Sequence, residues 1–287
     1  MTQDPALIGV FISGRTLSAW SYGDDGEIIA THSEESGSAD SAADSASRAS
    51  YFLHEWLGEA AVCPVIVAGA GDSVRPEEVA DFLPIPCRTH AISAGLISRR
   101  GLHLVPGLKQ AAPPDFLMGP ETSLFGIEET DGLVCMPGTH THHIVVEHGL
   151  ISGIMTEMTV SLMQAVLKEQ HHTEAQIFSE AVFREWTEKS LDTDDAVSPF
   201  AVHAACRIGK LKPELYQCAL AGLMIGADIA AHYEPGDDVI LIADGDLLDQ
   251  YGLALEILGV DIIEYSTEET RRDGLLEIAE VAGLLDE

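Results

Sequence analysis

Two segments of the chain follow the same pattern of strands and turns. Residues 10–32 and 133–155 each contain an apolar strand, a turn that includes glycine, a second strand, a tight glycine turn and a third strand. One β-meander alone is weak evidence, because many α+β proteins contain one. A second copy with a glycine in the same first turn favours a duplicated supersecondary unit. The expected strands are 7–12, 17–22 and 27–32 in the first copy, and 132–137, 142–147 and 150–155 in the second.

The segments after each meander complete the repeated unit. A helix that includes residues 51–57 and a buried strand at 64–70 follow the first copy, and a helix at 159–170 follows the second. Apolar residues at helical spacing then predict helices at 173–189, 196–208 and 213–233. The remaining elements are a strand at 238–243, a helix at 247–258, a strand at 260–265 and a helix at 268–285. This alternation implies parallel pairing, so we expect an α/β fold with duplicated βββαβ units.

Acidic residues far outnumber basic residues. The chain has 47 Asp and Glu against 15 Lys and Arg, which gives a formal net charge of −32. Such a surface repels nucleic acid and anionic membranes, so both are excluded as main partners. Solubility in a salty environment is the simplest explanation of the charge. An anionic ligand would need local help from Mg²⁺, helix N-termini or backbone amides.

The sequence gives no sign of export or of membrane insertion. No apolar run approaches the roughly 18 residues that a membrane-spanning helix needs, and the N-terminus lacks the pattern of a secretory signal. The five cysteines are scattered and odd in number, which is typical of reduced thiols. With 287 residues, 46% of them hydrophobic, the chain can form one large domain or two medium ones. These features predict a cytoplasmic protein.

The first turn of each meander is a candidate for phosphate contact. Backbone amides in such a turn can face a nucleotide phosphate. Glycine is expected at Gly14 and Gly138 because the backbone must approach closely and adopt a positive φ. The second turn adds hydroxyl and imidazole groups, including those of Thr139 and His140. Ordinary turn chemistry is the competing explanation for these two residues.

Five short motifs occur in order along nearly the whole chain. They are AGAGDS at 68–73, VPGL at 105–108, MGPET at 118–122 followed by LFG at 124–126, PGTH at 137–140, and AGLMIGA at 221–227. Together they resemble the motifs of the 2-dehydro-3-deoxygalactonokinase family, whose members transfer phosphate from ATP to a six-carbon keto-deoxy sugar acid. The resemblance implies a two-lobed, actin-like ATPase and sugar kinase fold (ribonuclease H-like). It implies an N-terminal lobe at 1–115 and a C-terminal lobe at 116–287, with ATP and Mg²⁺ as cofactors.

The resemblance also implies roles for individual residues. Glu121 is implied as the general base that takes a proton from a sugar hydroxyl as its oxygen attacks the γ-phosphate. The alternative for Glu121 is a solvated loop carboxylate. Implied phosphate or nucleotide contacts are Ser13, Gly14, Thr16, Gly138, Thr139, His140 and Gly245. Implied substrate contacts are Gly69, Ser73, Thr122 and His203.

Several charged positions of the family are altered in this chain. Phe11 stands where the family has the Asp that helps to hold Mg²⁺, and a phenyl ring cannot replace a hard oxygen ligand. Ser18 replaces an arginine, and residues 142–143 are histidines in place of Lys-Trp. The Mg²⁺ site is therefore not assigned at residue 11, and Asp244 or Asp246 is the candidate replacement.

Three functional hypotheses follow from these residues. The first is an active kinase of 2-dehydro-3-deoxy-D-galactonate with altered ligands. The second is a non-catalytic relative that binds a ligand or regulates a partner. The third is a kinase for a different, less anionic substrate. A small sugar acid and a nucleotide are the expected partners, and the resemblance allows for a homodimer.

Histidines gather at residues 140–143 and again at 171–172. His140 and His142 would share one face of a strand. A transition-metal site needs three or four ligands, and the sequence identifies no third one. No metal site is therefore predicted from these histidines.

Overall fold

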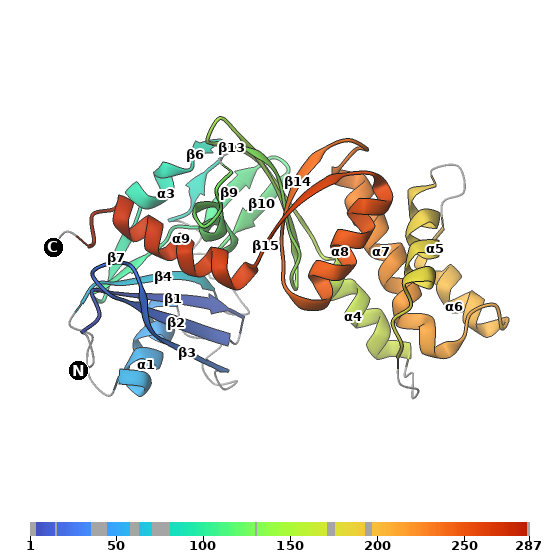
Figure 1. The fold of residues 1–287 in the computed structure, drawn as a ribbon, viewed down its shortest axis with the longest axis horizontal. Coiled ribbons are helices and arrows are strands. Elements are labelled where there is room, and N and C mark those ends of the chain that lie inside the picture. The colour runs from blue at the N-terminus through green and yellow to red at the C-terminus, as the bar shows by residue number, and fades with distance from the viewer. Residues whose placement is uncertain are drawn as a thin grey trace. The chain divides into compact units, whose positions relative to one another are not determined.

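The structure is a computed structural model that describes residues 4–14, 16–35, 45–57, 63–70, 81–129, 131–170, 176–192 and 197–285 (Figure 1). The chain forms two compact units that interleave along the sequence. Unit 1 comprises residues 1–131, 145–154 and 267–287, and unit 2 comprises residues 132–144 and 155–266. The lobes at 1–115 and 116–287 stay a prediction, and their boundary lies within strand β10 (Pro114–Leu117) of unit 1.

Unit 1 is built on a six-stranded sheet with the order β3-β2-β1-β4-β8-β7. The strands are β1 (Leu7–Ser13), β2 (Thr16–Tyr22), β3 (Ile28–Glu35), β4 (Val65–Ala70), β7 (Ile97–Arg99) and β8 (Leu102–Leu104). The first three form the predicted antiparallel meander, and β4 pairs with β1 in parallel. A strand inside a sheet that is covered on both faces is buried on both faces, which explains the continuous apolar run of β1.

Two helices from distant parts of the chain cover opposite faces of this sheet (Figure 1). Helix α1 (Ser45–Leu57) packs with Ile8, Val10 and Ile12 of β1 in one hydrophobic cluster. The alternate residues of β1, Gly9 and Phe11, face helix α9 (Thr267–Val281) instead. This division follows from the two-residue period of a strand. The C-terminal helix is therefore part of the N-terminal unit.

Residues 81–126 add short elements to unit 1. A three-stranded sheet has the order β10-β9-β5. In it, β5 (Leu83–Pro84) is parallel to β9 (Leu108–Ala111), and β10 is antiparallel to β9. The other elements are β6 (Cys87–Arg88), helix α3 (His90–Ala94) and the 3-10 helix η2 (Pro120–Phe125).

A second six-stranded sheet, with the order β15-β14-β11-β12-β13-β6, repeats the strand order around β1. Strand β11 (Gly132–Met136) lies between β12 (Thr141–Glu147) and β14 (Asp238–Ile242), as β1 lies between β2 and β4. Strand β13 (Leu150–Glu157) is the other neighbour of β12. β14 is parallel to β11, and β15 (Asp261–Tyr265) is parallel to β14, so the predicted parallel pairing is confirmed. The repeated order supports a duplicated unit.

Helix α7 (Tyr216–His232) is the central helix of unit 2 and is largely buried. The elements that contact it are α4 (Thr159–Gln170), α5 (Glu180–Leu191), α6 (Pro199–Arg207), the 3-10 helix η3 (Pro213–Leu215) and α8 (Gly245–Leu258). Gly222 lets α5 approach closely, because an added Cβ would overlap the carbonyl oxygen of Phe183. None of the helices in the described ranges is long and apolar enough to cross a membrane.

The prediction of a helix at 173–189 is wrong for the first part of that range. Residues 176–179 are not helical, and α5 begins at Glu180. A tertiary hydrogen bond holds this segment, because the amide of Ile177 donates to the carbonyl oxygen of Glu214 at 2.8 Å. Residues 171–175, which include the second group of histidines, lie outside the described residues.

Candidate functional site

The first glycine turn follows β1 in unit 1. Ser13 is exposed, and Gly14 has a φ of 55°, as expected for a turn that needs glycine. The buried Arg48 of α1 donates from Nη2 to the carbonyl oxygen of Gly14 at 2.8 Å. Thr16 pairs with Ser13 where β2 begins, and Arg15 lies outside the described residues. The Arg48 guanidinium therefore ties this turn to helix α1.

Phe11 fills the position at which the family resemblance leads one to expect an acidic metal ligand. Its side chain is 4% exposed, and the Arg271 guanidinium lies 4.3 Å from the centre of its ring. This arrangement is a cation–π contact. An apolar ring covered by a cation cannot hold Mg²⁺, so residue 11 does not fit the metal that kinase chemistry uses.

Glu121 lies in η2 and is fully buried, so the alternative of a solvated loop carboxylate is wrong. The amide of Gly119 donates to both carboxylate oxygens at 2.8 Å. The Thr122 hydroxyl, also buried, donates to the carbonyl oxygen of Gly119 at 2.6 Å. Burial raises the pKa of Glu121 from 4.5 to about 7, and the backbone hydrogen bonds oppose this rise only in part. The carboxyl therefore loses its proton at a higher pH than an ordinary glutamate.

Helix α9 holds η2 in place through two close backbone contacts. A Cβ added at Gly274 would overlap the carbonyl oxygen of Thr122. A Cβ added at Gly126 would overlap the carbonyl oxygen of Thr270. The position of Glu121 in unit 1 thus depends on the C-terminal helix.

Gly69 is the next-to-last residue of β4, beside the first turn. It pairs with Ile12 and has a φ of 84°, and an added Cβ would overlap the Ile12 carbonyl oxygen. A Cβ built on Gly119 would lie 3.0 Å from the Cα of Gly69 and 2.9 Å from Cζ of Phe11. The structure thus brings Gly69, Phe11 and the Glu121 turn together at one edge of the sheet. Ser73 lies outside the described residues.

The second glycine turn follows β11 in unit 2. Thr139 and His140 are exposed, and the Thr139 carbonyl oxygen accepts a hydrogen bond from the Ser161 hydroxyl at 2.6 Å. Gly138 has no positive φ, so that part of the prediction is wrong for this turn. Its glycine is explained by crowding instead, because an added Cβ would lie 3.3 Å from the carbonyl oxygen of His140.

Gly245 opens helix α8 directly after β14, the parallel neighbour of β11. Its φ is 56°, and no side chain or backbone atom lies within 4 Å of where its Cβ would be. Parallel neighbours present their carboxyl ends at the same edge of a sheet, so this turn and the turn at 137–140 share an edge. Asp244 and Asp246 flank Gly245 and are exposed. These groups fit a phosphate that carries a divalent cation.

His203 lies on α6 and is half-buried. Its ring is 5.7 Å from that of Phe200, and its Nε2 lies 3.4 Å from Nε of Arg207. Both neighbours belong to the same helix.

Two features of the structure escaped the sequence reasoning. One is Arg271, which comes to Phe11 from the opposite end of the chain. The other is a buried group in unit 2 made by His143, Asp228 and His232. An acidic residue inside the apolar AGLMIGAD segment was a usable signal for Asp228, because a buried carboxylate needs partners.

Known proteins resemble this chain over most of its length. The family model described as 2-keto-3-deoxy-galactonokinase matches residues 14–278. The chain is 26% identical to the protein named "Probable 2-dehydro-3-deoxygalactonokinase DgoK1" of Rhizobium meliloti (strain 1021), covering 89% of this chain and 90% of that protein. It is 28% identical to the 2-dehydro-3-deoxygalactonokinase of Escherichia coli (strain K12), covering 75% of this chain and 78% of that protein.

A crystal structure shows the same fold. It comes from Sinorhizobium meliloti, is assigned as a 2-dehydro-3-deoxygalactonokinase, and has a TM-score of 0.84 at 23% identity, covering 96% of this chain and 98% of that chain. The expected α/β, actin-like sugar kinase fold is thereby confirmed. Because the family model covers far more than half of the sequence, the chain belongs to the 2-keto-3-deoxy-galactonokinase family.

Proposed function

We propose that the protein is an ATP-dependent kinase that phosphorylates 2-dehydro-3-deoxy-D-galactonate. Family membership supports this activity, and the relatives in Rhizobium meliloti and Escherichia coli carry its name. The observation in this chain that carries the proposal is Glu121, a buried carboxyl whose pKa is raised to about 7. A general base works best when its pKa lies near the working pH.

In the proposed reaction, Glu121 accepts the proton of a substrate hydroxyl. The hydroxyl oxygen forms a bond to the γ-phosphorus, and the bond between that phosphorus and the oxygen bridging to the β-phosphate breaks, which releases ADP. The carboxylate is enclosed in unit 1, so this role requires the η2 turn to open toward the substrate. The proposed substrate contacts of unit 1 are Thr122, which follows Glu121, Gly69, which lies beside Gly119, and Ser73. His203 is the proposed contact of unit 2.

The phosphates of ATP are proposed to lie against the glycine turns. Ser13, Thr139 and His140 are exposed and Gly14 and Gly138 are half-buried, which supports this role for each turn within its own unit. Gly245 adds the N-terminus of α8, where backbone amides favour an anion.

Asp244 and Asp246 are proposed to hold the Mg²⁺ that neutralises the phosphates, since residue 11 cannot. Both carboxylates are exposed beside the turn that follows β14. Oxygen ligands are what Mg²⁺ prefers, and it commonly keeps several waters with only one or two carboxylates. In the family an acidic residue at the position of Phe11 helps to hold the metal, whereas the proposal assigns this role to residues that follow β14.

The direct test is ADP release from purified protein with Mg-ATP and 2-dehydro-3-deoxy-D-galactonate. Turnover in the usual kinase range, about 1–100 s⁻¹, is expected. The substitution Asp244→Asn together with Asp246→Asn should raise the Mg²⁺ concentration needed for half-maximal rate. A folded protein that releases no ADP above the level seen with ATP alone would contradict the proposal.

The second candidate is a non-catalytic relative that binds a ligand or regulates a partner. Phe11 favours it, because this ring occupies the place of a metal ligand and is covered by Arg271. A rise in melting temperature on adding Mg-ATP, without ADP release, would support this candidate. We also propose that the protein is cytoplasmic, where ATP is available. We further propose that it forms a homodimer, which a measurement of its molecular mass in solution tests.

A further inference from the structure

A compact group of polar side chains lies inside unit 2, apart from the glycine turns. His143 comes from β12, while Asp228 and His232 come from α7. Asp228 and His232 are four positions apart on the helix and therefore lie on the same face. The side chains of His143 and Asp228 are 5% and 1% exposed, whereas the His232 side chain retains 13% exposure.

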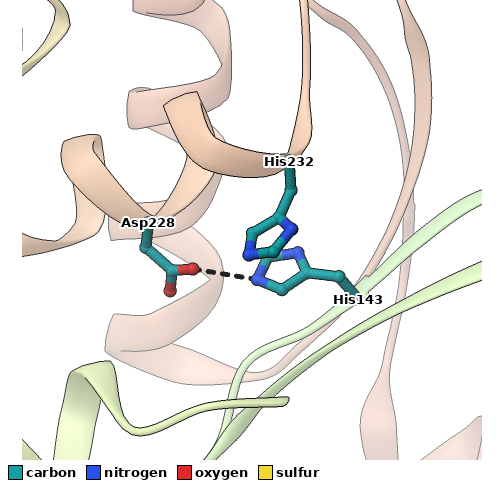
Figure 2. Close-up of side chains that lie close together, drawn as sticks. All are labelled: His143, Asp228 and His232. Carbon is teal, nitrogen blue, oxygen red and sulfur yellow. Dashed lines mark hydrogen bonds and ion pairs between the residues drawn. The ribbon is translucent and has the colours of Figure 1, made fainter. Parts of the chain in front are cut away.

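The three side chains converge closely. Nε2 of His143 lies 2.9 Å from Oδ1 of Asp228. Figure 2 shows the His232 ring stacked on the His143 ring, with the Asp228 carboxylate at the edge of the pair. The ring centres are 3.8 Å apart and the planes differ by 19°. One ligand atom from each residue lies within 4.8 Å of the others.

Further partners fix the two buried members of the group. Nδ1 of His143 lies 2.7 Å from the Tyr233 hydroxyl, which leaves Nε2 as the atom that faces Asp228. Oδ2 of Asp228 accepts from the Tyr251 hydroxyl at 2.7 Å, which leaves Oδ1 facing His143. Outer hydrogen bonds of this kind are what orient the ligands in metal sites.

The charges also suit a cation. Asp228 is a buried carboxylate that is hydrogen-bonded to His143 and to the Tyr251 hydroxyl. Its hydrogen-bond partners in the described chain are His143, Tyr251 and Thr159, so no lysine or arginine neutralises this carboxylate.

We propose that His143, Asp228 and His232 bind a divalent first-row transition-metal ion such as Zn²⁺. Two imidazole nitrogens and one carboxylate oxygen form a mixed set that suits these ions, whereas Mg²⁺ prefers oxygen ligands alone. With metal–ligand bonds of roughly 2.1 Å, neighbouring ligand atoms lie about 3–3.5 Å apart. The 2.9 Å spacing of the His143 and Asp228 atoms is close to that range.

Binding requires one local adjustment. Nearly parallel rings do not point both lone pairs at one position, so the His232 ring tilts, and it is the more exposed of the two. The carboxylate of Glu157 lies 3.3 Å from Nε2 of His232 and is 42% exposed. It is positioned to orient His232 or to become a fourth ligand from the solvent side.

Zinc binding to the whole protein tests the proposal without reference to kinase activity. Chelator-treated protein is titrated with Zn²⁺ by calorimetry, in excess Mg²⁺ to occupy surface carboxylates. One ion per chain is expected, and Co²⁺ in its place should give the visible absorption of a nitrogen- and oxygen-ligated ion. Binding should also raise the melting temperature.

Three variants identify the ligands. His232→Ala, at the partly exposed position, should weaken Zn²⁺ binding at least tenfold while the far-UV spectrum stays unchanged. Tyr251→Phe removes the hydroxyl that bonds Asp228 and Thr141 but keeps all three ligands, and it should weaken Zn²⁺ binding about tenfold. His142→Ala is the matched control, because His142 is the adjacent strand residue and its Nδ1 contacts Thr156 instead. It should bind Zn²⁺ like the unmodified protein.

Two results would overturn the proposal. One is the absence of a stoichiometric Zn²⁺ site in the folded, chelator-treated protein. The other is a site whose affinity is unchanged in both His232→Ala and Tyr251→Phe, which would place the ion elsewhere. If His232→Ala does not fold, Tyr251→Phe decides the matter, since it keeps the ring and all three ligands.

Discussion

At position 11 a phenyl ring lies where a carboxylate is expected from the family, and a guanidinium covers that ring. The two side chains come from β1 and α9, and both belong to unit 1. A carboxylate at position 11 would place a negative charge beside Arg271, whereas the Phe11 ring makes a cation–π contact with this guanidinium and adds no negative charge. A chain of net charge −32 needs such local positive charge if it binds a sugar acid.

Substituting Arg271 by methionine tests this role. Arg271→Met keeps an unbranched side chain that can pack on the Phe11 ring, but it removes the charge. We expect the KM for the sugar acid to rise about tenfold, as for loss of one charged contact, while kcat changes less. Arg272→Met is the control, because Arg272 is half-buried and pairs with the neighbouring Asp273. Equal KM values in both variants would remove Arg271 from substrate binding.

The raised pKa of Glu121 predicts that the free energy of unfolding depends on pH. Its pKa is about 7 in the folded chain against a usual 4.5, so the folded chain binds the proton more tightly than the unfolded chain. This contribution is fully present below about pH 4.5 and is lost as the pH rises through about 7. Two to three pKa units correspond to about 3 kcal/mol.

The substitution Glu121→Gln mimics the protonated carboxyl and keeps an acceptor for the Gly119 amide. We expect the variant to be as stable as the original near pH 4 and more stable above pH 7, by up to about 3 kcal/mol. Urea unfolding at both pH values measures the difference. If Glu121 is the base, the same variant loses kinase activity as it gains stability. A constant stability difference across this pH range would contradict the raised pKa.

At the scale of elements, regular sequence patterns predicted the strands well. An element boundary set by a tertiary contact was not predicted. The meander of β1 to β3 and the parallel strands β14 and β15 match their predicted ranges, because period and turn residues are local properties. The start of α5 was wrong because the hydrogen bond from Ile177 to Glu214 overrides helical spacing.

The sites divide in the same way. The glycine turns are visible as motifs, whereas the group of His143, Asp228 and His232 joins a strand to a helix far along the chain. A sequence periodicity of 2 or 3.6 places residues on a face of one element, but it does not say which faces meet. Only two ligands on one helix, Asp228 and His232, could have been paired from spacing alone.

Close packing of α9 on η2 gives a prediction at this scale. Gly274→Ala places a Cβ against the Thr122 carbonyl oxygen, so the helix must move away and unfolding should require about 1–3 kcal/mol less. The matched control is Gly252→Ala in α8, where an added Cβ meets its nearest atom at an ordinary 3.5 Å. That variant should be neutral or more stable by about 0.5–1 kcal/mol, because alanine favours a helix over glycine. Urea unfolding compares them, and equal effects would contradict the close contact.

For the whole molecule, the excess of negative charge should make stability depend on salt. A net charge of −32 on 287 residues repels itself more strongly in the compact folded state than in the expanded unfolded state. Salt shortens the range of this repulsion from about 10 Å at 0.1 M to about 3 Å at 1 M. The melting temperature should therefore rise as KCl is increased over this range.

The pH separates this effect from other actions of salt. Near pH 4.4, the isoelectric point expected from the sequence, the net charge approaches zero and the repulsion disappears. The KCl dependence of the melting temperature should then be nearly flat, whereas at pH 8 it should be steep. Salt effects on apolar hydration do not depend on the charge of the protein, so they would persist at both pH values. An equal KCl dependence at pH 4.4 and pH 8 would therefore show that the acidic surface is not what limits the stability of this chain at low salt.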